Sequence, residues 1–431
     1  MNILMIIIDD LRKDHPLTNG FHEDSPSRIE KWIDSSVVFN NCFSTSGWTF
    51  PACASIFSGY MPSSVSMPTH YNGNGAPNKF KFSTIAENLK IKGYRTIGIL
   101  NNNNFEKIYG WDRGFDQFEC LKQYWQRRPL NWMPDCLHHN KSFKRGIGWL
   151  QQSSKSEQPW FILLHTNIVH DYYFNKPYYD KYNVYIEKKK NISYGAISNR
   201  MLFNAKTIWS KKKLSSEETD YIKSRYYSGV RYASNQLAKL LGSYDPDNTM
   251  VILVSDHGEG FDQERGYVYH RGRLQNDLLH VQLIIHPPHN REDIYDLLNQ
   301  TASRNVSTID IAPTIYDILE IPFQTEGVSL LKEHPPDRSI RMEDSRIIRF
   351  QDCTLGIVDI DKLPYQIVAE INGNTKTHTF KMGDKKRTLS IDLGQDFYEL
   401  KSNSNPMFKN PDHLCDWLKE DIKPYITMVK A

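Results

Sequence analysis

The chain has 431 residues, of which 39% are hydrophobic, 12% aromatic and 24% charged, and this composition excludes a disordered or fibrous protein. The length allows one large core with a smaller appended domain. A formal net charge of +3 is close to balanced, so nothing favours binding to nucleic acid or to a membrane surface.

Cysteine usage and the absence of long apolar runs bear on the compartment. The six cysteines are scattered and form no C-x-x-C pair, which favours reduced thiols in a cytoplasmic protein. No stretch reaches about 18 consecutive apolar residues, so we expect a soluble chain without a membrane span. The apolar run at 3–8 is too short for the core of a signal peptide, and we expect no cleaved leader.

The first predicted element is a strand at 3–8 (ILMIII), followed directly by Asp9 and Asp10. A short, continuous apolar run predicts a strand of a parallel sheet that is buried on both faces. Open α/β sheets bind their ligands at the carboxyl ends of such strands. The two aspartates are therefore placed where a site is expected.

The stretch WTFPACASIFSG at 48–59 predicts a turn followed by a helix. Pro51 suits the first turn of a helix, and the small residues that follow allow close packing. Thr49 then has two interpretations. It either caps the helix through its side chain, or it presents its hydroxyl to a site at the helix N-terminus.

Further along the chain, apolar strands alternate with helical patterns. The strands are predicted at 95–100, 160–165 and 250–255, and the helices at 83–92, 216–241 and 308–319. This alternation predicts an α/β sandwich with a mostly parallel sheet. The strand at 95–100 runs into an asparagine cluster, and the other two end in His165 and in Asp256-His257. Polar residues at several strand ends indicate that this edge of the sheet is a site.

After Pro322 the helical alternation fades. Between 346 and 400, short β-rich runs separated by Gly, Asn and Asp predict a small antiparallel sheet, and 410–425 has a helical pattern. We therefore expect a catalytic domain at 1–335 and a C-terminal α+β subdomain at 336–431.

The residue types at the strand ends suit a divalent cation. Asp9, Asp10, Asp256 and His257 offer hard or borderline ligands, and a hydroxyl bound to the same cation, such as that of Thr49, has a lowered pKa. Taken alone, an Asp-His pair is equally explained as a loop start with a helix-capping aspartate. The acidic pair on a second strand end favours the metal interpretation.

These segments resemble the sulfatase branch of the alkaline phosphatase superfamily. The similarity extends over nearly the whole chain, and it is carried by IIIDDLRKDH, GWTFPACASIFSGYMP, GYRTIGILNNNNF, YGWDRGFDQFE, PWFILLHTNIVHDYY, VILVSDHGEGF, YHRG, STIDIAPTIYDILEIP and DFYELKSNSNP. The resemblance implies an alkaline phosphatase-like α/β/α sandwich with a mostly parallel central sheet and a small C-terminal antiparallel subdomain.

The chain departs from the sulfatase pattern at the nucleophile. Thr49 occupies the position where sulfatases carry a cysteine or serine that is oxidised to formylglycine, and threonine is no substrate for that oxidation. Cys53 falls on the arginine position of that motif, and we interpret it as a packed thiol. Phosphoglycerol transferases, phosphoethanolamine transferases and nucleotide pyrophosphatases of the superfamily use an unmodified threonine. His257, where many sulfatases have asparagine, favours the same phospho-transfer members.

The resemblance also implies roles for individual residues. One divalent ion, with Mn or Zn favoured and Ca or Mg as alternatives, is expected on Asp9, Asp10, Thr49, Asp256 and His257. The two-metal members carry a further Asp-x-x-x-His that HTNIVHDYY lacks. Thr49 is the expected nucleophile, and His170 and His270 bind the non-bridging oxygens and protonate the leaving group. His165 and Arg12 are expected to bind substrate, although His165 is equally explained as a core residue.

The sequence thus predicts a metal-dependent hydrolase or transferase that acts on phosphodiesters or related phosphate and sulfate esters of small molecules or glycans. Two alternatives stay open at this point. One is a sulfatase that works without formylglycine, and the other is a catalytically silent binding protein of the same fold. The retained ligand set argues against the silent protein.

Overall fold

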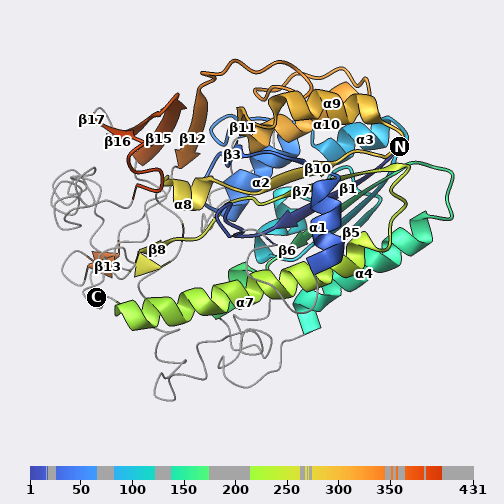
Figure 1. Ribbon diagram of the computed structural model, residues 1–431, viewed down its shortest axis with the longest axis horizontal. Helices are drawn as coiled ribbons and strands as arrows, with labels where there is room; N and C mark the ends of the chain where they lie inside the picture. Colours follow the sequence, from blue (N-terminus) through green and yellow to red (C-terminus); the bar gives the residue numbers. More distant parts are fainter. Residues whose placement is uncertain are drawn as a thin grey trace.

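The computed structural model describes residues 1–15, 17, 26–65, 82–121, 137–173, 214–262, 267–268, 270, 274–344, 351–352, 356–357, 365–382 and 385–399. Its centre is a seven-stranded sheet in the order β2-β10-β7-β1-β6-β4-β5 (Figure 1). The strands are β2 (Val37–Val38), β10 (Leu283–His286), β7 (Thr249–Val254), β1 (Asn2–Ile8), β6 (Trp160–Thr166), β4 (Arg95–Leu100) and β5 (Gln117–Cys120). The five strands from β7 to β5 are parallel, and β10 is antiparallel to both of its neighbours. The predicted mostly parallel sheet is confirmed.

Helices cover both faces of this sheet (Figure 1). Alternate residues of β1 enter different cores, because successive side chains of a strand point to opposite faces. One core is shared with α2 (Thr49–Ser58), α3 (Ile85–Ile91), α9 (Glu292–Thr301) and α10 (Ile311–Ile318), and the other with α1 (Pro26–Asp34), α4 (Leu137–Ser153) and α7 (Ser216–Leu241). Two helical layers around one sheet confirm the predicted α/β/α sandwich.

The predicted helices form where their end signals are strong. The long helix α7 has the predicted bounds, because Ser215 and Glu218 form a capping box at its start. A second capping box, of Thr84 and Glu87, starts α3 slightly later than predicted. The helix predicted at 308–319 begins as a 3-10 turn at Thr308–Asp310 before α10.

A four-stranded antiparallel sheet follows the sandwich, in the order β12-β15-β16-β17. Its strands are β12 (Ile340–Asp344), β15 (Tyr365–Asn372), β16 (Thr375–Met382) and β17 (Lys385–Asp392). This confirms the small C-terminal sheet, although β12 precedes the predicted runs. The run predicted at 346–350 and the helix predicted at 410–425 lie outside the described residues. The domain boundary at 335 stays a prediction.

Short elements complete the described chain. They are β3 (Asn41–Phe43) paired with β11 (Asn305–Ser307), β8 (Phe261–Asp262) with β9 (Tyr267–Val268), β13 (Gln351–Asp352) with β14 (Gly356–Ile357), helix α8 (Asn276–Leu279) and 3-10 turns at Asn103–Phe105, Lys107–Tyr109 and His170–Tyr173. Among the described residues, no helix is both long and apolar enough to cross a bilayer.

Strand register brings the polar strand ends together. In the middle of the sheet, Ile7 of β1 is level with His165 of β6 on one side and with Val254 of β7 on the other. Two residues further along, Asp9 and Asp256 therefore come level at the carboxyl edge. A parallel register thus builds the site from segments that lie more than 150 residues apart in the chain.

Candidate active site

The turn after β1 is locked in an unusual conformation. Asp10 has a φ of 74°, a left-handed conformation that costs a non-glycine residue on the order of 1–3 kcal/mol. Its backbone N–H donates to Oδ1 of Asp256 at 3.2 Å, and its carbonyl accepts from the Tyr226 hydroxyl at 2.8 Å. The next amide, of Leu11, donates to Oγ of Ser255 at 2.9 Å. These bonds from β7 and α7 hold both aspartates toward the centre of the sheet edge.

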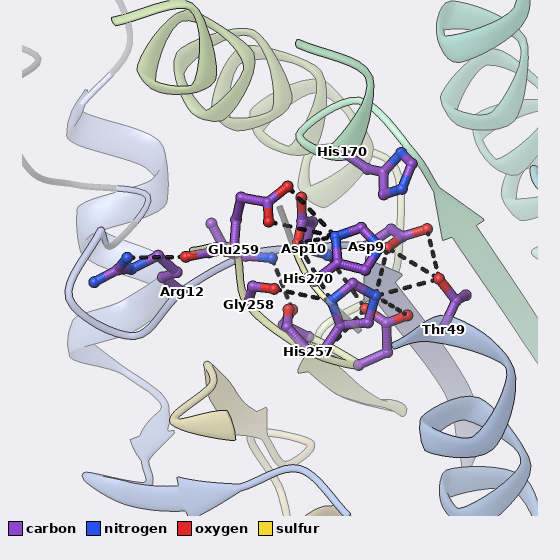
Figure 2. A network of polar contacts seen from close by, with 12 residues as sticks. Asp9, Asp10, Arg12, Thr49, His170, His257, Gly258, Glu259 and His270 are labelled. Carbon is purple, nitrogen blue, oxygen red and sulfur yellow. Dashed lines mark hydrogen bonds and ion pairs between the residues drawn. The ribbon is translucent and has the colours of Figure 1, made fainter. Parts of the chain in front are cut away.

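His257 lies between the three carboxylates. Its Nε2 is 3.3 Å from Oδ1 of Asp9, and its Nδ1 is 3.2 Å from Oδ1 of Asp10 (Figure 2). The same Nε2 lies 3.7 Å from Oδ2 of Asp256. All four side chains are fully buried. The structure therefore brings together the four residues that the sequence predicted as metal ligands.

Thr49 is the first residue of α2, so its interpretation as the helix cap is wrong. The cap position is Trp48, which makes no side-chain capping hydrogen bond. The Thr49 hydroxyl instead lies 3.2 Å from Nε2 of His257 and 3.5 Å from both carboxylate oxygens of Asp9 (Figure 2). Helix α2 is buried along its whole length, which fixes the position of this hydroxyl.

Two further predicted histidines border the cluster. His270 Nδ1 is 3.4 Å from Glu259 and 3.7 Å from Asp10, and its ring centre is 4.5 Å from that of His257. His170 begins the 3-10 turn after β6, with its ring centre 5.2 Å from that of His270. Figure 2 shows His270 next to His257, with His170 above them.

The two predicted substrate-binding residues differ in placement. His165 is buried beside Asp9, with Nε2 at 3.7 Å from Oδ2, and burial lowers its pKa to about 4. Arg12 lies on the opposite side of Glu259 from Thr49 (Figure 2). Its guanidinium binds Asp14 through two nitrogens, at 2.7 and 2.6 Å, and donates to the Glu259 carbonyl at 2.9 Å. Arg12 thus braces the loop after His257, and its predicted contact with substrate stays a prediction.

Sequence reasoning missed three residues that reach the cluster. Asn102 donates to Oδ2 of Asp9 at 3.3 Å, Glu259 accepts from the Tyr172 hydroxyl at 2.8 Å, and Sγ of Cys53 lies 3.7 Å from Oδ2 of Asp256. A signal existed for each. Asn102 belongs to the asparagine cluster after a predicted strand, Glu259 follows the Asp-His pair, and Cys53 is one helical turn after Thr49.

The pKa values in the cluster are shifted because three carboxylates lie close together and are buried away from solvent. Burial raises the pKa of Asp256 to about 7, with the charge of Asp9 adding to the effect, and burial also raises the pKa of Asp10. For Asp9, burial acts upward, but His170 and then His257 outweigh it and lower the pKa to about 2. For His257, burial acts downward, but Asp256 and Asp10 outweigh it and hold the pKa well above its usual value.

These residues fit a divalent cation. The ligand atoms of Asp9, Asp256 and His257 lie within 4.8 Å of one another, as do those of Asp10, His257 and His270. Among the described residues, the carboxylate oxygens of the fully buried Asp10 have no hydrogen bond of good geometry, and their nearest contact is the 3.2 Å approach of Oδ1 to Nδ1 of His257. Buried oxygens of this kind are normally satisfied, and carboxylate with imidazole suits Mn or Zn.

Comparisons with known proteins agree with this fold. The family model described as Sulfatase matches residues 1–321. The uncharacterized sulfatase YidJ of Escherichia coli (strain K12) is 24% identical over 366 residues, covering 77% of this chain and 70% of that protein. Human iduronate 2-sulfatase is 21% identical over 312 residues, covering 60% of this chain and 54% of its own.

Solved structures give the same result. The phosphonate monoester hydrolase of Agrobacterium radiobacter superposes with a TM-score of 0.67 at 16% identity, covering 98% of this chain and 96% of that one. A structure described as a 2-O GAG sulfatase superposes with a TM-score of 0.65 at 17% identity, covering 98% and 93%. At these identities the structures establish the fold that was predicted from the sequence.

Proposed function

Because the chain belongs to the sulfatase family of the alkaline phosphatase superfamily, we propose that it is a metal-dependent hydrolase that cleaves phosphodiesters through unmodified Thr49. The observation that carries this proposal is the position of the Thr49 hydroxyl. It lies 3.2 Å from His257 and 3.5 Å from Asp9, at the first residue of a buried helix. A hydroxyl in that position faces the group of side chains best suited to hold a cation.

The metal ligands, the N-terminal end of α2 and Thr49 each have a separate role in the proposed reaction. A divalent ion on Asp9, Asp10, Asp256 and His257 would lower the pKa of the Thr49 hydroxyl and neutralise the phosphate oxygens. The N-terminal end of α2 carries a partial positive charge that favours an anion in front of Thr49. The Thr49 hydroxyl gives up its proton to solvent, and its Oγ1 attacks phosphorus in line with the leaving oxygen. The ester bond to that oxygen breaks, and Thr49 then carries a phosphodiester that keeps the second alcohol of the substrate.

The histidines supply protons and hydrogen bonds. Burial acts to lower the pKa of His170, but Asp9 and the contact with Asp171 outweigh it and raise the pKa to about 10. His170 therefore carries a proton near neutral pH. It binds a non-bridging oxygen together with His270, and one of the two protonates the leaving oxygen. Water then attacks phosphorus, one of its protons passes to Thr49 Oγ1, and a phosphomonoester leaves. Transfer to an alcohol has no support among the relatives named above, so water is the proposed acceptor.

The choice of phosphate over sulfate rests on the nucleophile. A formylglycine hydrate expels sulfate by collapsing to an aldehyde, whereas a sulfated threonine has no such exit and needs a second displacement at sulfur. Phosphothreonine is the easier intermediate to hydrolyse. The fold does not decide the matter, because it is shared with a phosphonate monoester hydrolase and with sulfatases.

A second candidate is a sulfuric ester hydrolase that uses threonine directly. It is favoured by the curated relatives, which include the sulfatase YidJ and human iduronate 2-sulfatase. Under either candidate the substrate is a small-molecule or glycan-linked ester. A cytoplasmic location stays a prediction, to be tested by fractionation of the native host.

The test is a panel of matched nitrophenyl esters assayed with Mn, Zn, Ca and Mg in turn. The panel contains a phosphodiester, a phosphomonoester, a phosphonate monoester and a sulfate. We expect the phosphodiester to have the highest kcat/KM and Mn or Zn to support the fastest rate. A sulfate preference above about tenfold, equivalent to about 1.4 kcal/mol in the barrier, would favour the second candidate instead.

A further inference from the structure

A second group of donor atoms meets beside the catalytic cluster. Sγ of Cys53, a ring nitrogen of His165 and a carboxylate oxygen of Asp256 all lie within 4.8 Å of one another. The three side chains come from α2, β6 and the end of β7, and each is fully buried. A thiol, an imidazole and a carboxylate are the ligand types that structural and catalytic zinc sites combine.

His165 makes an edge-on ring contact with Phe105, but its two nitrogens are left unused in the described structure. Neither of its ring nitrogens has a hydrogen-bond partner among the described residues, although the side chain is fully buried. The nearest acidic oxygen, Oδ2 of Asp9, is 3.7 Å from Nε2, beyond hydrogen-bond length. Buried imidazole nitrogens are normally satisfied, so the ring is oriented toward something other than a protein donor or acceptor.

We propose that Cys53, His165 and Asp256 form a second metal site, which binds Zn²⁺ next to the ion held by Asp9, Asp10, Asp256 and His257. Zinc bonds are about 2.3 Å long to sulfur and about 2.0–2.2 Å long to oxygen. On a tetrahedral zinc ion, a sulfur and an oxygen ligand atom are therefore roughly 3.5 Å from each other. The 3.7 Å between Sγ of Cys53 and Oδ2 of Asp256 matches that spacing.

Asp256 belongs to both groups of donor atoms, so its carboxylate would help to hold both ions. The two ions of two-metal catalytic sites are about 3.5–4 Å apart. A second ion would add positive charge beside Asp9 and Asp256. Its binding would replace two expectations from the sequence, a single ion per chain and a packed thiol at Cys53.

Zinc binding at this site displaces a proton. When the ion binds, the S–H bond breaks, the sulfur lone pair forms the metal bond, and the proton leaves to solvent.

The test uses the full-length chain, stripped with a chelator and reloaded with Co²⁺ or Zn²⁺. We expect the cobalt protein to show a near-ultraviolet thiolate-to-cobalt charge-transfer band, and the zinc protein to hold two ions per chain by elemental analysis. Cys53→Ala should lose the band and retain one ion. The matched control is Cys42→Ala, which removes another buried thiol from β3, outside the cluster, and should keep the band and both ions.

Either of two results would overturn the proposal. No charge-transfer band in the wild-type protein would mean that Cys53 is only a packed thiol. A band with one ion per chain would mean that Cys53 binds the first ion and that no second site exists. Both readouts measure metal binding without turnover, so they are independent of whether phosphodiesters are the substrate. Circular dichroism of each alanine variant checks that it is folded.

Discussion

At the scale of single residues, Asp256 is the side chain on which the metal chemistry depends most, because it belongs to two groups of donor atoms. We predict that Asp256→Asn lowers both metal content and kcat/KM by at least about 100-fold, since it removes charge from a ligand of the cation. Metal analysis and steady-state rates check this.

A matched control for that substitution lies on the surface. Asp247 has a side chain that is 74% exposed, and it pairs only with the exposed His289 among the contacts described. Asp247→Asn should leave metal content and rate unchanged. An Asp256→Asn protein that retains full metal and full activity would show that the carboxylate cluster has been misassigned.

His170 makes the free energy of unfolding of the metal-free protein depend on pH, and the direction of this dependence follows from its pKa. Burial lowers its pKa, but Asp9 and Asp171 outweigh that effect and raise the pKa to about 10, above the unfolded value of 6.5. The stabilisation is therefore complete below pH 6.5 and is lost as pH rises toward about 10. The loss is at most about 1.4 kcal/mol per pH unit.

The measurement is denaturant unfolding of chelator-treated protein at about pH 8.5 and about pH 9.5, well above the pKa of about 7 of Asp256. Wild type should lose stability between the two pH values, and His170→Asn should lose less. Equal losses in the two proteins would contradict the raised pKa of His170.

The sequence predicted the chemical role of a residue where that residue directly follows a strand. Asp9, Asp10, Asp256 and His257 were found because parallel strands place their carboxyl ends at one edge. The positions of Cys53 and Glu259 next to predicted site residues were a signal, but their contacts could not be derived from it, because each depends on which neighbour its side chain faces. Arg12 was expected to bind substrate; its guanidinium is bound by the Asp14 carboxylate two residues away, and its contact with substrate stays a prediction.

At the scale of elements, helix α2 is held in place at its C-terminal end by a glycine. Gly59 has a φ of 76°, and a Cβ on it would lie 2.8 Å from the Cγ2 atom of Thr325. We predict that Gly59→Ala costs about 2–4 kcal/mol, from left-handed strain together with the steric clash. Because α2 carries Thr49, the rate should fall as well.

Gly93 provides the comparison. It also has a left-handed φ, of 92°, but nothing lies within 4 Å of its Cβ position. Gly93→Ala should therefore cost only about 1–2 kcal/mol and leave the rate unchanged. Thermal or denaturant unfolding of the two variants measures the difference. Equal destabilisation would mean that contact with Thr325 does not position α2.

Elements with strong local signals were predicted well, and those that depend on distant partners were not. The strands β1, β4, β6 and β7 are continuous apolar runs, and α7 begins at a capping box. By contrast β2 has two residues and exists because it pairs with β10. A strand this short has no pattern of its own to recognise.

At the scale of the whole molecule, a buried ion pair of the C-terminal part, Lys376 with Glu399, contacts the catalytic part through Asn276. Lys376 of β16 is fully buried, and its ammonium contacts Glu399 at 2.6 Å and Oδ1 of Asn276 at 2.7 Å. The segment around Asn276 in turn packs behind the metal-ligand loop, since the Gly258 amide donates to the Leu278 carbonyl at 2.7 Å.

We predict that Glu399→Gln destabilises the chain by about 3–5 kcal/mol, because Lys376 would be left as a buried charge without its carboxylate. The control is Glu370→Gln on β15 of the same sheet. Glu370 is 43% exposed and pairs with Arg341 at 3.4 Å, so its loss should cost under about 0.5 kcal/mol. Comparable unfolding midpoints for the two variants would show that the pair does not join the sheet to the catalytic part.

The architecture was predictable because strands and helices alternate regularly, and the antiparallel C-terminal sheet because its runs are short and bounded by turn residues. Strand order was not predictable, since β10 joins the sheet antiparallel beside β7 through side-chain packing that has no sequence signature. The ion pair between Lys376 and Glu399 also lay beyond prediction, because two charged residues 23 positions apart carry no sign of their burial.

The central claim is that unmodified Thr49 performs the first displacement. The most direct measurement is the kcat/KM of Thr49→Ala protein, loaded with metal, on the best substrate of the nitrophenyl panel. We predict a loss of at least about 1,000-fold, equivalent to about 4 kcal/mol in the barrier, with the fold unchanged by circular dichroism and partial activity retained in Thr49→Ser. A Thr49→Ala protein within about tenfold of wild type would contradict the claim.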